Sequence, residues 1–270
     1  MLFVEKLLSK LRTLVIDTGE RYVPSGSFDE LDATHTTNYI FAKQFIEGKV
    51  VLDVGCGCGY GCEYLARSGA KNVIGVDVSR EAVKFAKAHY NAGNLDYIVM
   101  DAQNLAFKDR LFDVVVSFEV IEHLYNAKKY LFEVHRVLKT DGIFIISTPN
   151  KKVSSPCFKK AVLPFHVKEF YPEELYILLS QIFKAVNILG KRISNEEILM
   201  KEQEFRRSWR FKIISRLSQY DFVRMLARLL PLDIKQIVTG AGQLRLKPSD
   251  FELSTEYVKH SPCLVAILRK

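Results

Sequence analysis

The stretch Val51-Leu-Asp-Val-Gly-Cys-Gly-Cys-Gly-Tyr60 decides the fold, because a short apolar run passes directly into three glycines spaced two apart. The run has the character of a buried strand, and residues Tyr60–Ser68 have the spacing of a helix that follows it. Glycine is required where a backbone turns tightly and approaches a ligand without a Cβ in the way. Many proteins contain one such turn, so the segments on either side determine its meaning.

Short apolar runs and helical stretches alternate along the chain. The predicted strands are Val50–Val54, Val73–Val76, Tyr97–Met100, Phe112–Ser117, Ile143–Ser147, Ala185–Leu189 and Cys263–Leu268. The predicted helices are Tyr60–Ser68, Arg80–Asn91, Ala127–Leu138 and Pro172–Leu179. Continuous Val and Ile runs that alternate with helices predict an α/β fold with a doubly wound, mostly parallel, seven-stranded sheet.

Four segments are expected along the chain. They are an N-terminal helical lid (1–48, with an amphipathic helix over 2–16), an α/β core (49–190), a basic, mainly helical insertion (191–261) and the final strand of the core sheet (262–270).

Composition is that of an ordinary globular protein, with 48% hydrophobic and 26% charged residues among 270. No apolar stretch is long enough to span a membrane, and Glu5, Lys6 and Lys10 interrupt the apolar N-terminus, unlike a signal peptide. Five cysteines, three of them in one loop, favour free thiols in a reducing compartment. We therefore expect a cytoplasmic protein.

Positive charge is confined to the second half of the chain. Residues 1–150 carry 17 Lys and Arg against 19 Asp and Glu, whereas residues 151–270 carry 22 against 12. Within that half, residues 201–235 form a basic amphipathic pattern. One interpretation is an insertion helix with a solvated charged face. The others are contact with anionic lipid headgroups, which would place the protein peripherally at a membrane surface, with a phosphate-bearing substrate, or with RNA.

Carboxylates follow the second and third predicted strands. Asp77 ends the second strand, where an acid can accept hydrogen bonds from both ribose hydroxyls of a nucleoside. Asp101 follows the third strand, where it could meet the adenine amino group. The glycine spacing is G-x-G-x-G and not the G-x-G-x-x-G of dinucleotide binders, which favours a nucleoside ligand without a pyrophosphate.

Five motifs in this order resemble the class I S-adenosylmethionine-dependent methyltransferases. They are VLDVGCGCGYG, VIGVDVSREAVKFA, the Asp101-Ala102 pair, FDVVVSFEVIEHL and EVHRVLKTDGIFIISTPN. The resemblance covers about residues 30–190 and implies a Rossmann-like methyltransferase fold. It also implies an enzyme that uses S-adenosyl-L-methionine and releases S-adenosyl-L-homocysteine. A dinucleotide oxidoreductase or a non-catalytic relative is the alternative.

The same resemblance implies a set of cofactor-binding residues. The residues around the methionine part of the cofactor are Asp53, Gly55, Cys56, Gly57 and Gly59. Asp77 would hold the ribose, and Val78, Asp101 and Ala102 would contact the adenine. Phe118, at the end of the fourth strand, completes the set. The C-x-C-x3-C spacing within this loop does not match a four-ligand zinc site, and cofactor binding already accounts for it.

Methyl transfer is an in-line displacement, so the enzyme mainly aligns the reactants and supplies a base when a hydroxyl attacks. The candidate catalytic residues are Glu119, Glu122 and His123 after the fourth strand, which would share a face if a helix begins there, and His166 in a later loop. They could form a proton relay or bind a divalent cation. E-x-x-E-H resembles the metal-binding segment of ubiquinone-pathway O-methyltransferases and, with a later His, of small-RNA 2′-O-methyltransferases. Closure of the cofactor pocket without metal is the alternative, and His166 could simply cap the next helix.

Upstream, Arg21-Tyr22-Val-Pro and His35-x-x-Asn-Tyr39 resemble a lid segment that commonly carries Arg where this chain has Asn38. We therefore expect no charged contact from position 38 to the cofactor carboxylate. The combined prediction is a methyltransferase that acts at oxygen on a small-molecule, anionic glycan or lipid-linked acceptor. The alternatives are a metal-assisted RNA ribose 2′-O-methyltransferase and a non-catalytic cofactor-binding subunit.

Overall fold

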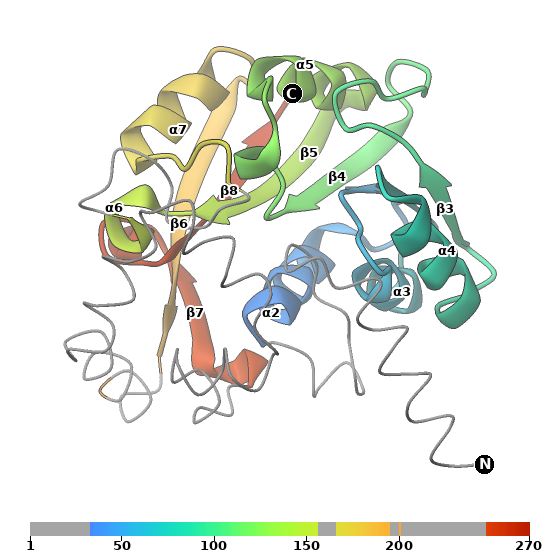
Figure 1. Cartoon of the computed structure of the whole chain (residues 1–270), viewed down its shortest axis with the longest axis horizontal. Coiled ribbons are helices and arrows are strands. Elements are labelled where there is room, and N and C mark those ends of the chain that lie inside the picture. The colour runs from blue at the N-terminus through green and yellow to red at the C-terminus, as the bar shows by residue number, and fades with distance from the viewer. Residues whose placement is uncertain (1–32, 156–165, 195–199, 201–246) are drawn as a thin grey trace, which may run out of the picture.

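An eight-stranded mixed sheet forms the centre of the molecule, with helices on both of its faces (Figure 1). The computed structural model describes residues 33–155, 166–194, 200 and 247–270. The expected helix over 2–16, most of the expected lid, and the basic segment 201–235 lie outside the described residues. Within the described ranges, no helix combines the length and the apolar character needed to cross a membrane.

The sheet reverses its strand order beside β1. Its strands are β1 (Val50–Val54), β2 (Asn72–Asp77), β3 (Leu95–Val99), β4 (Phe112–Phe118), β5 (Leu138–Pro149), β6 (Ala185–Ile193), β7 (Phe251–Ser254) and β8 (Cys263–Arg269). Their order is β3-β2-β1-β4-β5-β8-β6-β7. The first five are parallel, and β8 is antiparallel to β5 and to β6. This confirms the predicted doubly wound, mostly parallel sheet, and ligands of such sheets bind where the order reverses, here between β1 and β4.

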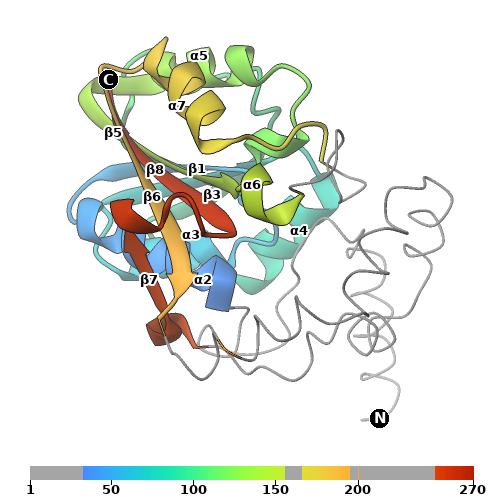
Figure 2. The same ribbon diagram turned by 90° about the vertical axis from the view of Figure 1, so that its left-hand side faces the viewer.

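Helices cover the two faces of the sheet in two layers (Figure 2). The α-helices are α2 (Ala33–Ala42), α3 (Tyr60–Arg67), α4 (Arg80–His89), α5 (Ala127–Val137), α6 (Lys151–Ser154) and α7 (Pro172–Ser180). Short 3-10 turns are η2 (Lys43–Phe45), η3 (Ile121–His123), η5 (Pro248–Asp250) and η6 (Thr255–Tyr257). Side chains of α5 and α7 belong to one buried apolar cluster, and side chains of α2, α3 and α4 belong to the other. Each face therefore has its own core.

The sheet has eight strands where seven were predicted, and described residues at both ends of the predicted insertion (191–261) belong to it. β6 continues to Ile193, beyond the expected end at Leu189. Residues Phe251–Ser254 form β7, an eighth strand, which pairs antiparallel with the part of β6 from Gly190 to Ile193. β8 pairs with one edge of β6 and β7 pairs with the other, so β7 forms the outer edge of the sheet.

Candidate active site

A cavity of about 480 Å³ opens beside the reversal point, at the carboxyl ends of β1, β2 and β4. Of the residues predicted from the sequence, those that line it are Gly55, Cys56, Gly57, Asp77, Val78, Asp101, Ala102, Phe118, Glu119 and His123. The predicted residues that do not line it are Asp53, Gly59, Glu122 and His166. The sheet therefore brings most of the predicted site residues together at the cavity. The remaining predicted residues lie behind the cavity wall or beside the cavity.

The three glycines of the loop after β1 all have positive φ, but they have different structural roles. Gly55, Gly57 and Gly59 have φ values of 81°, 53° and 90°, a region that favours glycine. A Cβ at Gly57 would meet no atom within 4 Å, so this position leaves open space at the cavity wall. A Cβ at Gly59 would lie 2.6 Å from the Cβ of Ala86. Gly59 thus permits close packing of the loop on α4, which explains why it does not line the cavity.

The Asp77 carboxylate joins the glycine loop to the start of α4. Its Oδ2 accepts a hydrogen bond from the Gly57 backbone N–H (2.9 Å), and its Oδ1 accepts one from the Ser79 N–H (2.9 Å). Ser79 in turn caps α4 by accepting from the Ala82 N–H. The carboxylate is therefore held in one orientation at the wall of the cavity.

Asp53 lies behind the loop as a fully buried carboxyl group. Its Oδ2 accepts hydrogen bonds from the Tyr39 hydroxyl (3.0 Å) and the Cys62 thiol (3.2 Å). Its Oδ1 has no hydrogen-bond partner among the described residues. Burial raises the pKa of Asp53 to about 7, against the lowering effect of the hydrogen bonds from Cys62 and Tyr39. Asp53 thus holds Tyr39, and with it α2, against the loop.

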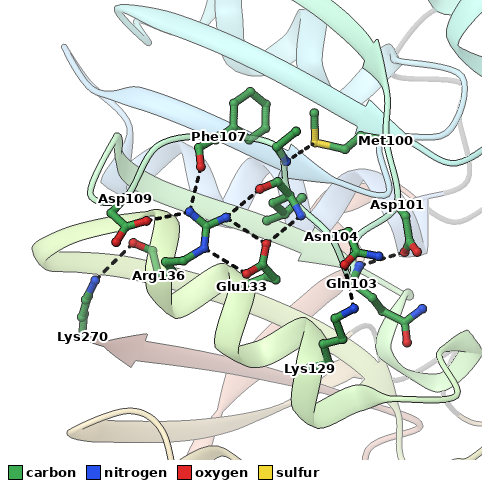
Figure 3. Close-up of polar contacts among 12 residues, drawn as sticks. Met100, Asp101, Gln103, Asn104, Phe107, Asp109, Lys129, Glu133, Arg136 and Lys270 are labelled. Carbon is green, nitrogen blue, oxygen red and sulfur yellow. Dashed lines mark hydrogen bonds and ion pairs between the residues drawn. The ribbon is translucent and has the colours of Figure 1, made fainter.

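The wall beside Asp101 is held by an arginine on α5 (Figure 3). The Arg136 guanidinium donates to the backbone oxygens of Phe107 (2.7 Å) and Leu105 (2.6 Å). It also forms ion pairs of 2.8 Å with Asp109 and Glu133. Glu133 accepts a further hydrogen bond from the Leu105 N–H (2.8 Å), and the Arg136 contact lowers the Glu133 pKa.

Glu119 differs from the predicted arrangement, in which it shares a helix face with Glu122 and His123. Its backbone is left-handed (φ 55°), and the following turn is the 3-10 helix Ile121–His123. Its Oε1 accepts a hydrogen bond from the Ser147 hydroxyl (2.6 Å), and its N–H donates to the Ser147 carbonyl (3.1 Å). The first residue after β4 is here part of a sharp turn, so helical spacing does not apply.

Glu122, His123 and His166 form a cluster whose ligand atoms all lie within 4.8 Å of one another. Glu122 is fully buried, its Oε2 accepts from the Thr148 hydroxyl (3.0 Å), and its Oε1 has no partner among the described residues. Burial first, and then the neighbouring Glu119 carboxylate, raise the pKa of Glu122 well above its ordinary value. The structure thus brings together three of the four candidate catalytic residues and turns the fourth towards β5.

His166 is oriented by a buried carboxylate, Glu169. The distance between His166 Nδ1 and Glu169 Oε1 is 2.8 Å, so Nε2 is the ring nitrogen left for another contact. Glu169 Oε2 also accepts hydrogen bonds from Ser154 (3.0 Å) and Ser155. Burial alone would raise the pKa of Glu169, but the hydrogen bonds from His166 and Ser155 outweigh it and lower the pKa.

Comparison with known proteins identifies the family. The family described as "Methyltransferase domain" matches residues 52–146. A probable S-adenosylmethionine-dependent methyltransferase of Mycolicibacterium smegmatis is 35% identical over 175 residues, which cover 64% of this chain and 67% of that protein. The chain belongs to the class I S-adenosylmethionine-dependent methyltransferases.

Two further likenesses bear on the fold and on the relatives of this methyltransferase. The ubiquinone biosynthesis O-methyltransferase of Bartonella bacilliformis is 30% identical over 170 residues, covering 54% of this chain and 68% of that one. A solved S-adenosylmethionine-dependent methyltransferase from Mesorhizobium loti has a TM-score of 0.58 at 14% identity, covering 88% of this chain and all of that one, and so supports the fold alone. The methyltransferase spans little more than half the length of several other curated relatives.

The cavity of this methyltransferase fits the cofactor that its family uses. Gly57 leaves the loop side open, Asp77 presents a fixed carboxylate, and Val78 presents an apolar side chain that is 68% exposed. An acid suits ribose hydroxyls, and an exposed apolar side chain at a cavity wall suits an adenine face. These residues would hold S-adenosylmethionine, which supplies an activated methyl group on sulfur.

Sequence reasoning left several cavity residues of the methyltransferase out of its predicted site. They are His35, Tyr39, Cys58, Tyr60, Met100, Gln103, Val120, Leu124 and Tyr125. Most adjoin predicted residues, but His35 and Tyr39 come from α2, which packs over the cavity by tertiary contacts. Tyr39 contacts the rings of Tyr60 and Phe118 edge-to-face, at centroid distances of 5.7 and 4.9 Å. The resemblance to a lid segment was the one signal that pointed to these two.

Arg136→Ala is expected to loosen the Asp101 wall, because the backbone oxygens of Leu105 and Phe107 lose their charged donor. We expect the free energy of unfolding to fall by about 2 kcal/mol and binding of S-adenosylhomocysteine to weaken about tenfold. Urea unfolding and calorimetric titration measure the two effects. Arg67→Ala, which removes a surface ion pair with Glu63 and a long hydrogen bond to the Asn91 carbonyl (3.4 Å), is the control and leaves both quantities nearly unchanged. Unchanged affinity in Arg136→Ala would refute this role.

Proposed function

We propose that the methyltransferase transfers a methyl group from S-adenosylmethionine to an oxygen atom of a small-molecule, glycan or lipid-linked acceptor, and that a divalent cation binds at the cluster of Glu122, His123 and His166. The observation that carries the proposal is this cluster, because His123 belongs both to it and to the cavity wall. The O-methyltransferase of Bartonella bacilliformis supports oxygen as the target.

The donor set of the cluster fits a divalent transition metal. Two imidazoles and one carboxylate suit zinc, manganese, iron or cobalt better than calcium or magnesium, which prefer oxygen ligands alone. The unpartnered Glu122 Oε1 is buried, and a buried carboxylate oxygen without a partner is costly unless something binds it. Glu169 fixes the His166 ring by contacting its Nδ1, as carboxylates commonly do, in metal-bound histidines, at the ring nitrogen that does not bind the metal.

Three protein ligands leave positions for acceptor oxygens. A cation bound there supplies Lewis acidity that lowers the pKa of a bound hydroxyl. The neighbouring Glu119 carboxylate lines the cavity and can accept a proton or orient the acceptor. The protein itself contributes alignment, since methyl transfer needs the acceptor oxygen, the methyl carbon and the sulfur in line.

Metal binding is tested directly with Mn²⁺. The metal-stripped methyltransferase is expected to bind one Mn²⁺ per chain by electron paramagnetic resonance, and Glu122→Gln and His166→Gln are each expected to weaken binding at least about tenfold. His89→Gln, at an exposed position on α4, is the matched control and binds as the wild type does. Equal Mn²⁺ affinity in the Glu122, His166 and His89 variants would refute the cation site.

The acceptor class is tested by methyl transfer from radiolabelled S-adenosylmethionine to four probes: a catechol carboxylate, a long-chain hydroxy fatty acid, a short single-stranded RNA and a primary amine. We expect transfer to one of the two small hydroxyl acceptors, stimulated by Mn²⁺ and lost in Glu122→Gln. Transfer to RNA alone would replace this proposal with the RNA ribose 2′-O-methyltransferase, and transfer to the amine alone would refute oxygen as the target. No transfer despite S-adenosylhomocysteine binding would favour the non-catalytic subunit.

A further inference from the structure

Lys191 on β6 is a buried lysine to which neither the cavity nor the cation site gives a role. Only 4% of its surface is exposed. Its Nζ donates hydrogen bonds to the Thr34 carbonyl (2.5 Å) and to Asn38 Oδ1 (2.9 Å). Both acceptors lie on α2, the helix that brings His35 and Tyr39 to the cavity. One charged side chain thus connects the far end of the sheet to this helix.

The contacts continue from Asn38 to Glu119 as a chain of hydrogen bonds. Asn38 Nδ2 donates to the Ser147 hydroxyl (3.1 Å), which donates to Glu119 Oε1 (2.6 Å). Cys263, the partner of Lys191 in the β6–β8 register, directs its thiol to the same Glu119 oxygen (3.4 Å). The Lys191 ammonium group therefore lies at one end of this series of hydrogen bonds, and the cavity-lining Glu119 carboxylate lies at the other.

Stability alone does not explain this arrangement. Burying an ammonium group carries a large desolvation cost, and the two contacts to uncharged oxygens, with the Phe251 ring 5.9 Å from Nζ, offset only part of it. Within the described ranges, Lys191 forms no ion pair with a carboxylate. Glu119 adds strain, because a non-glycine residue at φ 55° persists only where its surroundings hold it. The buried charge of Lys191 and the strained backbone of Glu119 lie at the two ends of one series of hydrogen bonds, which indicates a functional constraint.

We propose that Lys191 is a positioning residue, which pins α2 over the cofactor cavity and, through Asn38 and Ser147, fixes the orientation of the Glu119 carboxylate. The resemblance to the family lid indicated only that position 38, which is Asn, provides no charged contact to the cofactor carboxylate. The structure supplies a cation beside Asn38 from β6. The proposal does not depend on the acceptor or on the cation site.

Amide hydrogen exchange tests the contact with α2 without any ligand. In Lys191→Met, which keeps the length of the side chain and removes its charge, the α2 amides are expected to exchange at least about tenfold faster than in the wild type. Amides of β1 and β4 are expected to keep their rates. Lys184→Met, at an exposed position beside the start of β6, is the matched control and changes α2 exchange by less than about twofold.

Calorimetric titration with S-adenosylhomocysteine then tests the effect on the cavity. We expect binding to weaken about tenfold in Lys191→Met and to recover to within about threefold of the wild type in Lys191→Arg, which keeps the charge and the donors. A role in packing alone predicts the opposite order, because Met fills the space better than Arg does. Failure of the wild type to bind would count against the cofactor site, whereas the exchange measurement would still test Lys191.

The proposal is overturned if α2 exchange in Lys191→Met matches that in Lys184→Met, or if Met preserves the affinity better than Arg. Should Lys191→Met fail to fold, Ser147→Ala breaks the same chain by removing one hydroxyl. That variant is expected to weaken S-adenosylhomocysteine binding at least about threefold. Unchanged affinity in Ser147→Ala would equally overturn the proposal.

Discussion

Asp77→Ala is expected to weaken binding of S-adenosylhomocysteine by at least about 100-fold while the protein remains folded. The change removes the carboxylate that we assign to the ribose hydroxyls. It also deprives the Gly57 and Ser79 N–H groups of their acceptor, so the glycine loop and the start of α4 lose their shared anchor. Calorimetric titration measures the affinity, and circular dichroism checks the fold.

Asp96→Ala is the control for this variant. Asp96 lies on β3, with 67% of its side chain exposed, and its carboxylate contacts Lys87 at the surface (3.6 Å) and the Tyr97 N–H (2.7 Å). We expect its affinity to match the wild type within about twofold. A loss of less than tenfold in Asp77→Ala would contradict the assignment of Asp77 to the ribose and leave it a purely structural residue.

Gly59→Ala is expected mainly to lower the stability of the protein, and Gly57→Ala mainly to weaken ligand binding, although the two glycines lie in one loop. At Gly59 an added methyl group would lie 2.6 Å from Ala86 Cβ and 2.8 Å from the Tyr97 ring, at a φ of 90°. We expect the free energy of unfolding to fall by about 3 kcal/mol or more, from backbone strain and overpacking together. Urea unfolding measures this loss.

At Gly57 the added methyl group meets open space at the cavity wall. We expect Gly57→Ala to lose only about 1–2 kcal/mol of stability, from its positive φ, but to bind S-adenosylhomocysteine at least about tenfold more weakly. Each variant serves as the control for the other. If Gly57→Ala proved the less stable of the two, or bound the ligand normally, the assignment of its open side to the ligand would be wrong.

The core of the fold could be predicted from the sequence because its signals are local. The central strands β1 and β4 are short Val-rich runs that are buried on both faces, so their positions follow from composition alone. Asp77 and Asp101 could be placed because acids at strand ends of a parallel sheet meet at one edge. β7 escaped prediction, since four residues of edge strand carry little pattern of their own.

The residues missed at the site depend on contacts between distant segments. Lys191 meets Asn38 only because β6 and α2 pack side by side, and nothing near either residue in the sequence indicates it. Glu119 was placed on a helix face because Glu122 and His123 follow it by three and four residues, yet the strained turn after β4 directs it towards Ser147. Local spacing cannot foresee a left-handed residue that tertiary contacts hold in place.

The position of β8 between β5 and β6 has a consequence for synthesis of the chain. β6 does not pair with β5. The edge of β5 opposite β4 therefore keeps its backbone N–H and C=O groups unpaired until the ribosome has made residues Cys263–Arg269. An open parallel edge on a nascent chain is a template for pairing with other chains. Until β8 is made, this edge of β5 is therefore open to such pairing.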